Sequence, residues 1–135
     1  MRTHSAELRN HIARKNGIYD IIGIQETFLK PDVKFNIAGY VTLRRDRLDA
    51  SKGGLVTLIK HSIKYISSYN IKDVEELYVE ITTSTGYVTI SYVYMSPSLA
   101  VDKDKLKPLF ISSKNIIVGD FNASSTLWGS PVTNH

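Results

Sequence analysis

Two short runs of mostly β-branched residues constrain the fold of this chain more than any other feature. They occupy residues 19–24, which contain Asp-Ile-Ile-Gly-Ile, and residues 115–119, which read Asn-Ile-Ile-Val-Gly. Continuous apolar runs of this length are typical of strands that are buried on both faces. Polar side chains follow each run at once, with Glu26 after the first and Asp120 and Asn122 after the second. We therefore expect an α/β protein with its site at the carboxyl ends of two buried strands.

The rest of the chain predicts more strands than helices. A Ser cap at Ser5, helical spacing of apolar residues and an Asn-Gly stop predict a helix over residues 5–16. A second, short helix is expected over residues 102–110 despite Pro108. Further strands are expected over residues 40–44, 55–60, 63–69, 77–83 and 87–94. The last two strands alternate apolar with polar residues on either side of Ser-Thr-Gly, which predicts a β-hairpin.

Composition excludes several classes of protein. A chain of 135 residues with 42% hydrophobic and 22% charged residues is large enough for one folded domain and is unlike disordered chains. Because it has no cysteine, disulfides, thiolate nucleophiles and Cys-ligated zinc are excluded. It has neither a bilayer-spanning apolar run nor a signal-peptide pattern, so we expect an intracellular protein without a membrane partner. The net charge of +4 permits an anionic partner such as nucleic acid without indicating one.

The polar residues after the two runs suit a divalent cation. Mg²⁺ prefers carboxylate oxygen, and on a strand Asp120 and Asn122 would share a face because they are two positions apart. The alternative is that Asp and Asn after a strand are turn formers that bond their own backbone. The spacing alone favours the turn-forming alternative.

Four sequence blocks, which occur in a recognisable order along the chain, favour a functional site over simple turn formation at these residues. The blocks are IIGIQETFLKPD (residues 21–32), KGGLVTLIK (52–60), YVYMSPS (92–98) and IIVGDFNASSTLWGS (116–130). Together they resemble the endonuclease domain of non-LTR (LINE-type) retrotransposons, within the endonuclease/exonuclease/phosphatase superfamily that includes apurinic-site endonucleases. The resemblance implies a four-layered α/β sandwich, in which two packed mixed sheets are flanked by helices. It also implies Mg²⁺-dependent nicking of target DNA, with Mn²⁺ as a substitute, by a domain that is fused to a reverse transcriptase and acts in the nucleus.

The resemblance also assigns roles to individual residues. It makes Glu26 the metal ligand and directs the hydroxyl of Tyr94 to the scissile phosphate. It makes Asp120 the residue that orients or activates the attacking water, with Asn122 holding the phosphate or the Asp. The basic residues Arg44, Arg45, Arg47 and Lys52 fit DNA backbone contact and a solvated basic loop equally well.

The chain also departs from the family pattern. The family's first strand, with its Asn, and its C-terminal strands, with an Asp and a closing Ser-Asp-His, have no counterpart, so residues 1–135 are expected to form a single partial domain. We therefore expect exposed sheet edges and little or no nuclease activity from this chain alone. Two alternatives stay open: a non-catalytic retrotransposon remnant, and another phosphodiesterase or phosphatase of the same superfamily.

Overall fold

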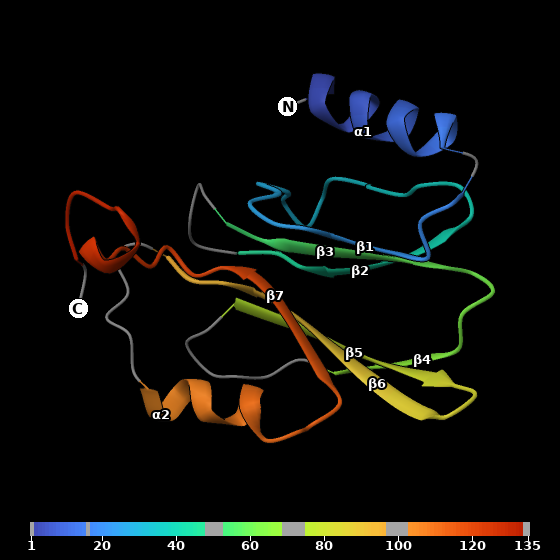
Figure 1. Ribbon diagram of the computed structural model, residues 1–135. Coiled ribbons are helices and arrows are strands. Elements are labelled where there is room, and N and C mark those ends of the chain that lie inside the picture. The colour runs from blue at the N-terminus through green and yellow to red at the C-terminus, as the bar shows by residue number, and fades with distance from the viewer. Residues whose placement is uncertain (1, 16, 48–52, 69–74, 97–102, 134–135) are drawn as a thin grey trace.

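Two β-sheets stack face to face between two helical layers in the computed structural model (Figure 1). The structure describes residues 2–15, 17–47, 53–68, 75–96 and 103–133. Helix α1 (Arg2–Arg14) covers the outer face of the first sheet, while α2 (Lys103–Leu106) and the 3-10 helix η1 (Lys107–Phe110) cover the second. A further 3-10 turn, η2 (Thr126–Trp128), lies near the end of the chain. This layered arrangement confirms the predicted α/β sandwich.

The first sheet is antiparallel and has the strand order β1-β3-β2. It consists of β1 (Ile21–Ile24), β2 (Tyr40–Arg45) and the central β3 (Leu55–Lys60). On one face of β3, Val56 and Leu58 pack with Ile12 of α1 in a buried cluster. On the other face, Leu55 packs between the sheets with Leu77 and Tyr94. Because both faces of β3 are covered, its apolar run is fully buried.

The second sheet is mixed and has the strand order β4-β5-β6-β7. It consists of β4 (Tyr65–Ser68), β5 (Glu75–Thr83), β6 (Gly86–Tyr94) and β7 (Asn115–Asp120). Strands β5 and β6 form the predicted hairpin, in which Thr83 pairs with Gly86 across a tight turn. Gly86 has φ of 123°, a conformation that glycine adopts readily. Strand β7 pairs with β6 in parallel, which places the carboxyl ends of both strands together.

The prediction that the first and last apolar runs are buried on both faces is wrong. Each forms an edge strand: β1 pairs only with β3, and β7 pairs only with β6, among the described residues. On β7, Ile116 is 51% and Val118 45% exposed. Ile116 and Val118 lie on the face of the second sheet that points towards the first sheet, as do their partners on β6. The described strands of the first sheet do not extend far enough to cover the side chains on β7. These two apolar runs therefore lie at the edges of the described sheets, whereas the apolar run of β3 lies at the centre of the first sheet.

Several predicted boundaries also move. Helix α1 begins at Arg2, so Ser5 lies inside the helix and is not its cap. The predicted helix over residues 102–110 is α-helical only to Leu106 and continues as a 3-10 helix, because Pro108 lacks the N–H that an α-helix needs. The strand predicted over residues 63–69 begins at Tyr65, after a turn. Positions 16, 69 and 102, which end or begin predicted elements, lie outside the described residues. None of the described helices is long and apolar enough to cross a bilayer.

Candidate active site at the strand ends

Glu26 and Tyr94 come from different sheets and meet at one end of the sandwich. Glu26 follows β1 and has an exposed side chain, whereas Tyr94 ends β6 and is only 4% exposed. The Tyr94 hydroxyl donates a hydrogen bond of 2.8 Å to Oε1 of Glu26. Two of the residues predicted for the site are therefore in direct contact.

This contact governs the protonation of Tyr94. The hydrogen bond to Glu26, burial, and the negative charges of Glu26 and Glu75 raise the pKa of Tyr94 to about 12, with Arg47 acting in the opposite direction. Tyr94 therefore keeps its proton at neutral pH and remains a hydrogen-bond donor.

Asp120 lies beside Tyr94 on the neighbouring strand. The two residues are register partners in the parallel pair of β6 and β7. The backbone N–H of Met95 donates to the carbonyl of Asp120 at 2.9 Å, which extends the pairing past the strand ends. Because Tyr94 points between the sheets, Asp120 shares that face, and its side chain is exposed. The carboxyl ends of β1, β6 and β7 thus bring three of the predicted residues to one region.

Asn122 is held by a local turn. Its backbone N–H donates to Oδ1 of Asp120 at 2.8 Å, and its side-chain Nδ2 donates to the carbonyl of Met95 at 2.7 Å. Strand β7 ends at Asp120, and Asn122 has a left-handed φ of 45°. Asp120 and Asn122 therefore do not share the face of one strand, contrary to the prediction from the sequence spacing. The turn-forming contacts expected of Asp and Asn after a strand are therefore present, and they also fix Asn122 next to the end of β6.

Strained backbone is concentrated in these two segments. Among the described residues, the non-glycine positions with positive φ are Glu26 at 49°, Phe28 at 51° and Asn122 at 45°. Such conformations cost on the order of 1–3 kcal/mol each and persist where the surrounding structure imposes them. They flank the site after β1 and β7, so the fold holds both segments in conformations that they would not adopt alone.

Two features that support Glu26 were missed by sequence reasoning. Gln25 donates from Nε2 to the carbonyl of Val93 at 3.1 Å, which links the end of β1 to β6. The carbonyls of Gly53 and Gly54 accept hydrogen bonds from the two residues after Glu26, at 3.0 and 3.2 Å. The KGG block carried the signal for this turn, but its glycines could not be assigned to the site without the fold.

The predicted DNA-contact residues have partners within the protein. Arg44 pairs with Asp46 at 2.7 Å, Arg45 donates to the carbonyl of Glu76 at 2.9 Å, and Arg47 forms an ion pair with Glu75. Lys52 lies outside the described residues. The contact of these residues with DNA stays a prediction.

The donor set fits a metal ion that is shared with a substrate. Within the described ranges, no group of three or more His, Cys, Asp or Glu side chains could enclose a metal ion. Mg²⁺ commonly binds through one or two carboxylates and keeps waters or phosphate oxygens as its other ligands. The exposed carboxylate of Glu26, fixed by Tyr94, suits that mode.

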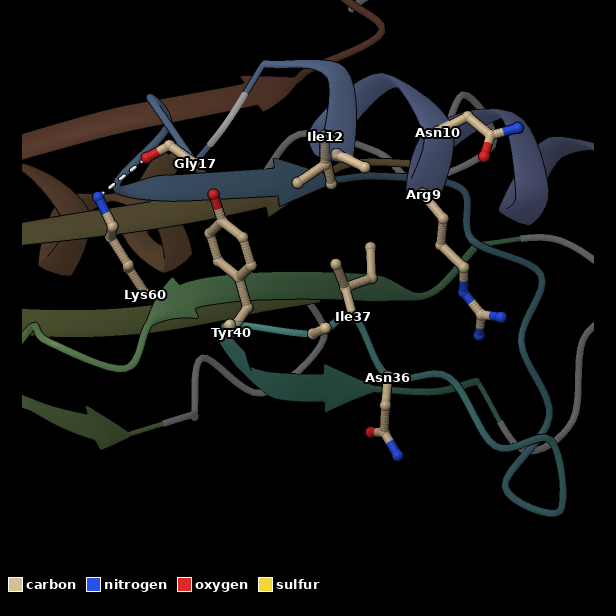
Figure 2. Close-up of a pocket in the computed structure, with 11 residues that line it drawn as sticks. Arg9, Asn10, Ile12, Gly17, Asn36, Ile37, Tyr40 and Lys60 are labelled. Carbon is tan, nitrogen blue, oxygen red and sulfur yellow. Dashed lines mark hydrogen bonds between the residues drawn. The ribbon is translucent and has the colours of Figure 1, made fainter.

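A separate surface pocket of about 470 Å³ lies between α1 and the first sheet (Figure 2). Ile12, Ile37 and Tyr40 form its apolar middle, with Arg9 and Lys60 towards its two ends. The ammonium group of Lys60 donates to the carbonyl of Gly17 at 2.9 Å. Of the predicted site residues that the structure describes, none lines this pocket. We place the functional site at the strand ends because the hydrogen-bonded polar groups and the strained backbone lie there.

Glu, Tyr and Asp side chains thus meet at adjoining strand ends of a two-sheet sandwich. The sequence pattern of the endonuclease/exonuclease/phosphatase family matches residues 1–134, so the chain belongs to that family. This confirms the family that the four sequence blocks indicated.

Relatives of this chain come from mobile elements. It is 27% identical over 117 residues to the RNA-directed DNA polymerase from mobile element jockey of Drosophila melanogaster, covering 83% of this chain and 13% of that protein. It is 28% identical over 121 residues to the probable RNA-directed DNA polymerase from transposon X-element of the same fly, covering 85% and 13%. The chain thus spans about an eighth of these relatives.

The fold also matches a solved structure. The endonuclease domain of TRAS1, a telomere-specific non-LTR retrotransposon, superposes with a TM-score of 0.68 at 20% sequence identity. The match covers 96% of this chain and 58% of that one. It supports the fold assignment.

Proposed function

We propose that this chain is part of a retrotransposon endonuclease that hydrolyses a phosphodiester bond of DNA and leaves a nick with a 3′-hydroxyl. The observation that carries the proposal is the Tyr94–Glu26 hydrogen bond beside Asp120, at the joined strand ends of a chain in this family. Relatives that are RNA-directed DNA polymerases support the idea that the nick primes reverse transcription and that the chain belongs to a polyprotein. Action on chromosomal DNA would then take place in the nucleus.

The three residues have separate roles in the proposed reaction. Glu26 would hold a divalent cation, Mg²⁺ or Mn²⁺ in its place. When bound, that cation would offset negative charge that develops on the phosphate and on the leaving O3′. Tyr94, protonated at neutral pH, would turn its single O–H from Glu26 to a phosphate oxygen when DNA binds. The Asp120 carboxylate would orient the attacking water and accept its proton as the water oxygen bonds to phosphorus and the P–O3′ bond breaks. The leaving O3′ would take a proton from solvent and become the 3′-hydroxyl.

Asn122 would act by holding the loop after β7 in place. Its amide is anchored to Met95, and its backbone N–H bonds Oδ1 of Asp120. The backbone contact limits the rotation of the Asp120 carboxylate, and the side-chain contact holds Asn122 itself in place. This fits the requirement that reacting groups be held within a fraction of an ångström of a productive geometry.

The experiment is metal-dependent nicking of supercoiled plasmid by a chimera. Residues 1–135 replace the matching segment of the TRAS1 endonuclease domain, which supplies the remainder of a complete domain. We expect nicking that requires Mg²⁺ or Mn²⁺ and falls by on the order of 10²-fold or more in Glu26→Gln and in Asp120→Ala.

The matched control is Asp32→Asn, which removes an exposed carboxylate from the segment after β1 without touching the site. It should nick at the unsubstituted rate. If Glu26→Gln and Asp120→Ala nick as fast as this control, the proposed roles are wrong.

A further inference from the structure

The carboxylate of Glu75 lies on the backbone of the Gly53-Gly54 turn. Its Oε2 accepts a hydrogen bond of 2.8 Å from the backbone N–H of Gly54, and its Oε1 is paired with the guanidinium of Arg47. The side chains of Glu75 and Arg47 are 13% and 31% exposed. The Glu75 carboxylate is thus restrained at both oxygens, by a hydrogen bond from a backbone N–H at Oε2 and by an ion pair with a guanidinium at Oε1.

Both glycines are required by this arrangement. A Cβ on Gly53 would lie 2.9 and 3.1 Å from the two oxygens of Glu75. A Cβ on Gly54 would lie 2.7 Å from Oγ1 of Thr27. Both glycines also have positive φ, at 101° and 88°, which favours glycine for a second reason. The turn is therefore built to fit a carboxylate on one side and the segment after β1 on the other.

The same turn fixes the backbone that carries Glu26. The carbonyl of Gly54 accepts the N–H of Thr27, and the carbonyl of Gly53 accepts the N–H of Phe28. These bonds hold the two residues that follow Glu26, whose own φ of 49° is unfavourable for a residue with a side chain. A chain of contacts thus runs from Arg47 through Glu75 and the glycine turn to Glu26.

We propose that Glu75, clamped by Arg47, is a positioning residue that keeps the Glu26 carboxylate on the Tyr94 hydroxyl and ready for a divalent cation. This inference rests on the proposed function, because it assigns Glu26 to the metal. It also gives Arg47 a role within the protein that does not depend on contact with DNA. Glu75 itself touches neither metal nor DNA in this account.

The test uses amide hydrogen exchange and Mn²⁺ binding by the 135-residue chain. In Glu75→Gln, the amides of Thr27 and Phe28 should exchange about tenfold faster, since a charge-assisted hydrogen bond that restrains the turn is weakened. The Mn²⁺ dissociation constant, measured by isothermal titration calorimetry, should rise by about the same factor. Arg47→Gln should produce the same two changes, more weakly.

The matched control is Glu80→Gln, on the same strand, where the carboxylate accepts a hydrogen bond from Tyr78 at 3.5 Å. In this variant, the amide exchange rates of Thr27 and Phe28 and the Mn²⁺ dissociation constant should equal those of the unsubstituted chain. In Glu26→Gln, Mn²⁺ binding should be lost while both amides exchange as before. If that variant still binds Mn²⁺, the proposed metal ligand is wrong, but the exchange rates still decide the role of Glu75.

Two results would overturn the inference. One is Thr27 and Phe28 exchange in Glu75→Gln that equals the exchange in Glu80→Gln. The other is faster exchange throughout the chain, which would mean that Glu75 only stabilises the fold. Should Glu75→Gln fail to fold alone, the same substitution in the nicking chimera must raise the metal concentration for half-maximal nicking about tenfold with unchanged plasmid KM. An unchanged metal requirement there would equally refute the inference.

Discussion

Gly23 sets the distance between the two sheets next to the candidate site. A Cβ added to this residue of β1 would lie 1.8 Å from Cε1 of Tyr92 on β6. Since carbon atoms pack at about 3.5–4.0 Å, the ring would have to retreat by roughly 2 Å. Tyr92 is 8% exposed and has little room to move, so Gly23→Ala should lower the free energy of unfolding by about 1–3 kcal/mol. For a domain of this size, the corresponding decrease in Tm is roughly 3–9 °C.

Thermal unfolding followed by circular dichroism measures this loss, and a second background identifies its cause. Tyr92→Ala removes the ring and is itself destabilising, but in that background Gly23→Ala should cost little, giving a coupling energy of about 0.5–3 kcal/mol. Equal costs of Gly23→Ala in both backgrounds would refute the claim that the Tyr92 ring requires a glycine here.

Three further predictions concern groups around the site. Burial raises the pKa of Glu76 above 4.5, and a hydrogen bond with Ser91 and the charge of Arg45 act in the opposite direction. The folded state therefore binds this proton more tightly than the unfolded state. The stabilisation that results is complete below pH 4.5 and is lost as the pH rises through the raised pKa. The difference in unfolding free energy between the unsubstituted chain and Glu76→Gln, measured in urea, should therefore fall as the pH rises from 4.5 through the raised pKa. A difference that does not change with pH would contradict this prediction. In ¹³C-tyrosine NMR, Tyr94 should titrate near the value of about 12 and at lower pH in Glu26→Gln; an unchanged titration would show that Glu26 does not set it. Gln25→Ala should lower the unfolding free energy by about 1 kcal/mol in urea denaturation, unless the bond to Val93 contributes nothing.

Local patterns predicted the central strand and the hairpin well. Residues 55–60 form β3 with the predicted bounds, and the alternation on either side of Ser-Thr-Gly led to the β5–β6 hairpin. The edge positions of β1 and β7 could not be read from the sequence, because an apolar run reports affinity for burial and not the number of strands that pair beside it. The exposure of Ile116 and Val118 on β7 is the clearest case in which the apolar run led to a wrong prediction of burial.

The sequence predicted the candidate residues one by one, but not the contacts that join them. Family blocks indicated Glu26, Tyr94 and Asp120, and the structure places them at adjoining strand ends. Glu75 gave no signal of its own, because it begins a strand 21 residues beyond its partner Gly54. Such long-range contacts depend on how the two sheets stack, which single-sequence patterns do not contain.

The central claim is that Glu26 holds a divalent cation close to Tyr94 and Asp120. The most direct measurement is a map of paramagnetic broadening by Mn²⁺ over the backbone amides of the 135-residue chain. We predict that amides next to Glu26, Tyr94 and Asp120 broaden together at low Mn²⁺ concentration, and that all of them sharpen again in Glu26→Gln. Broadening that centres on another carboxylate, such as Asp20 or Asp32, or that survives Glu26→Gln, would contradict the account.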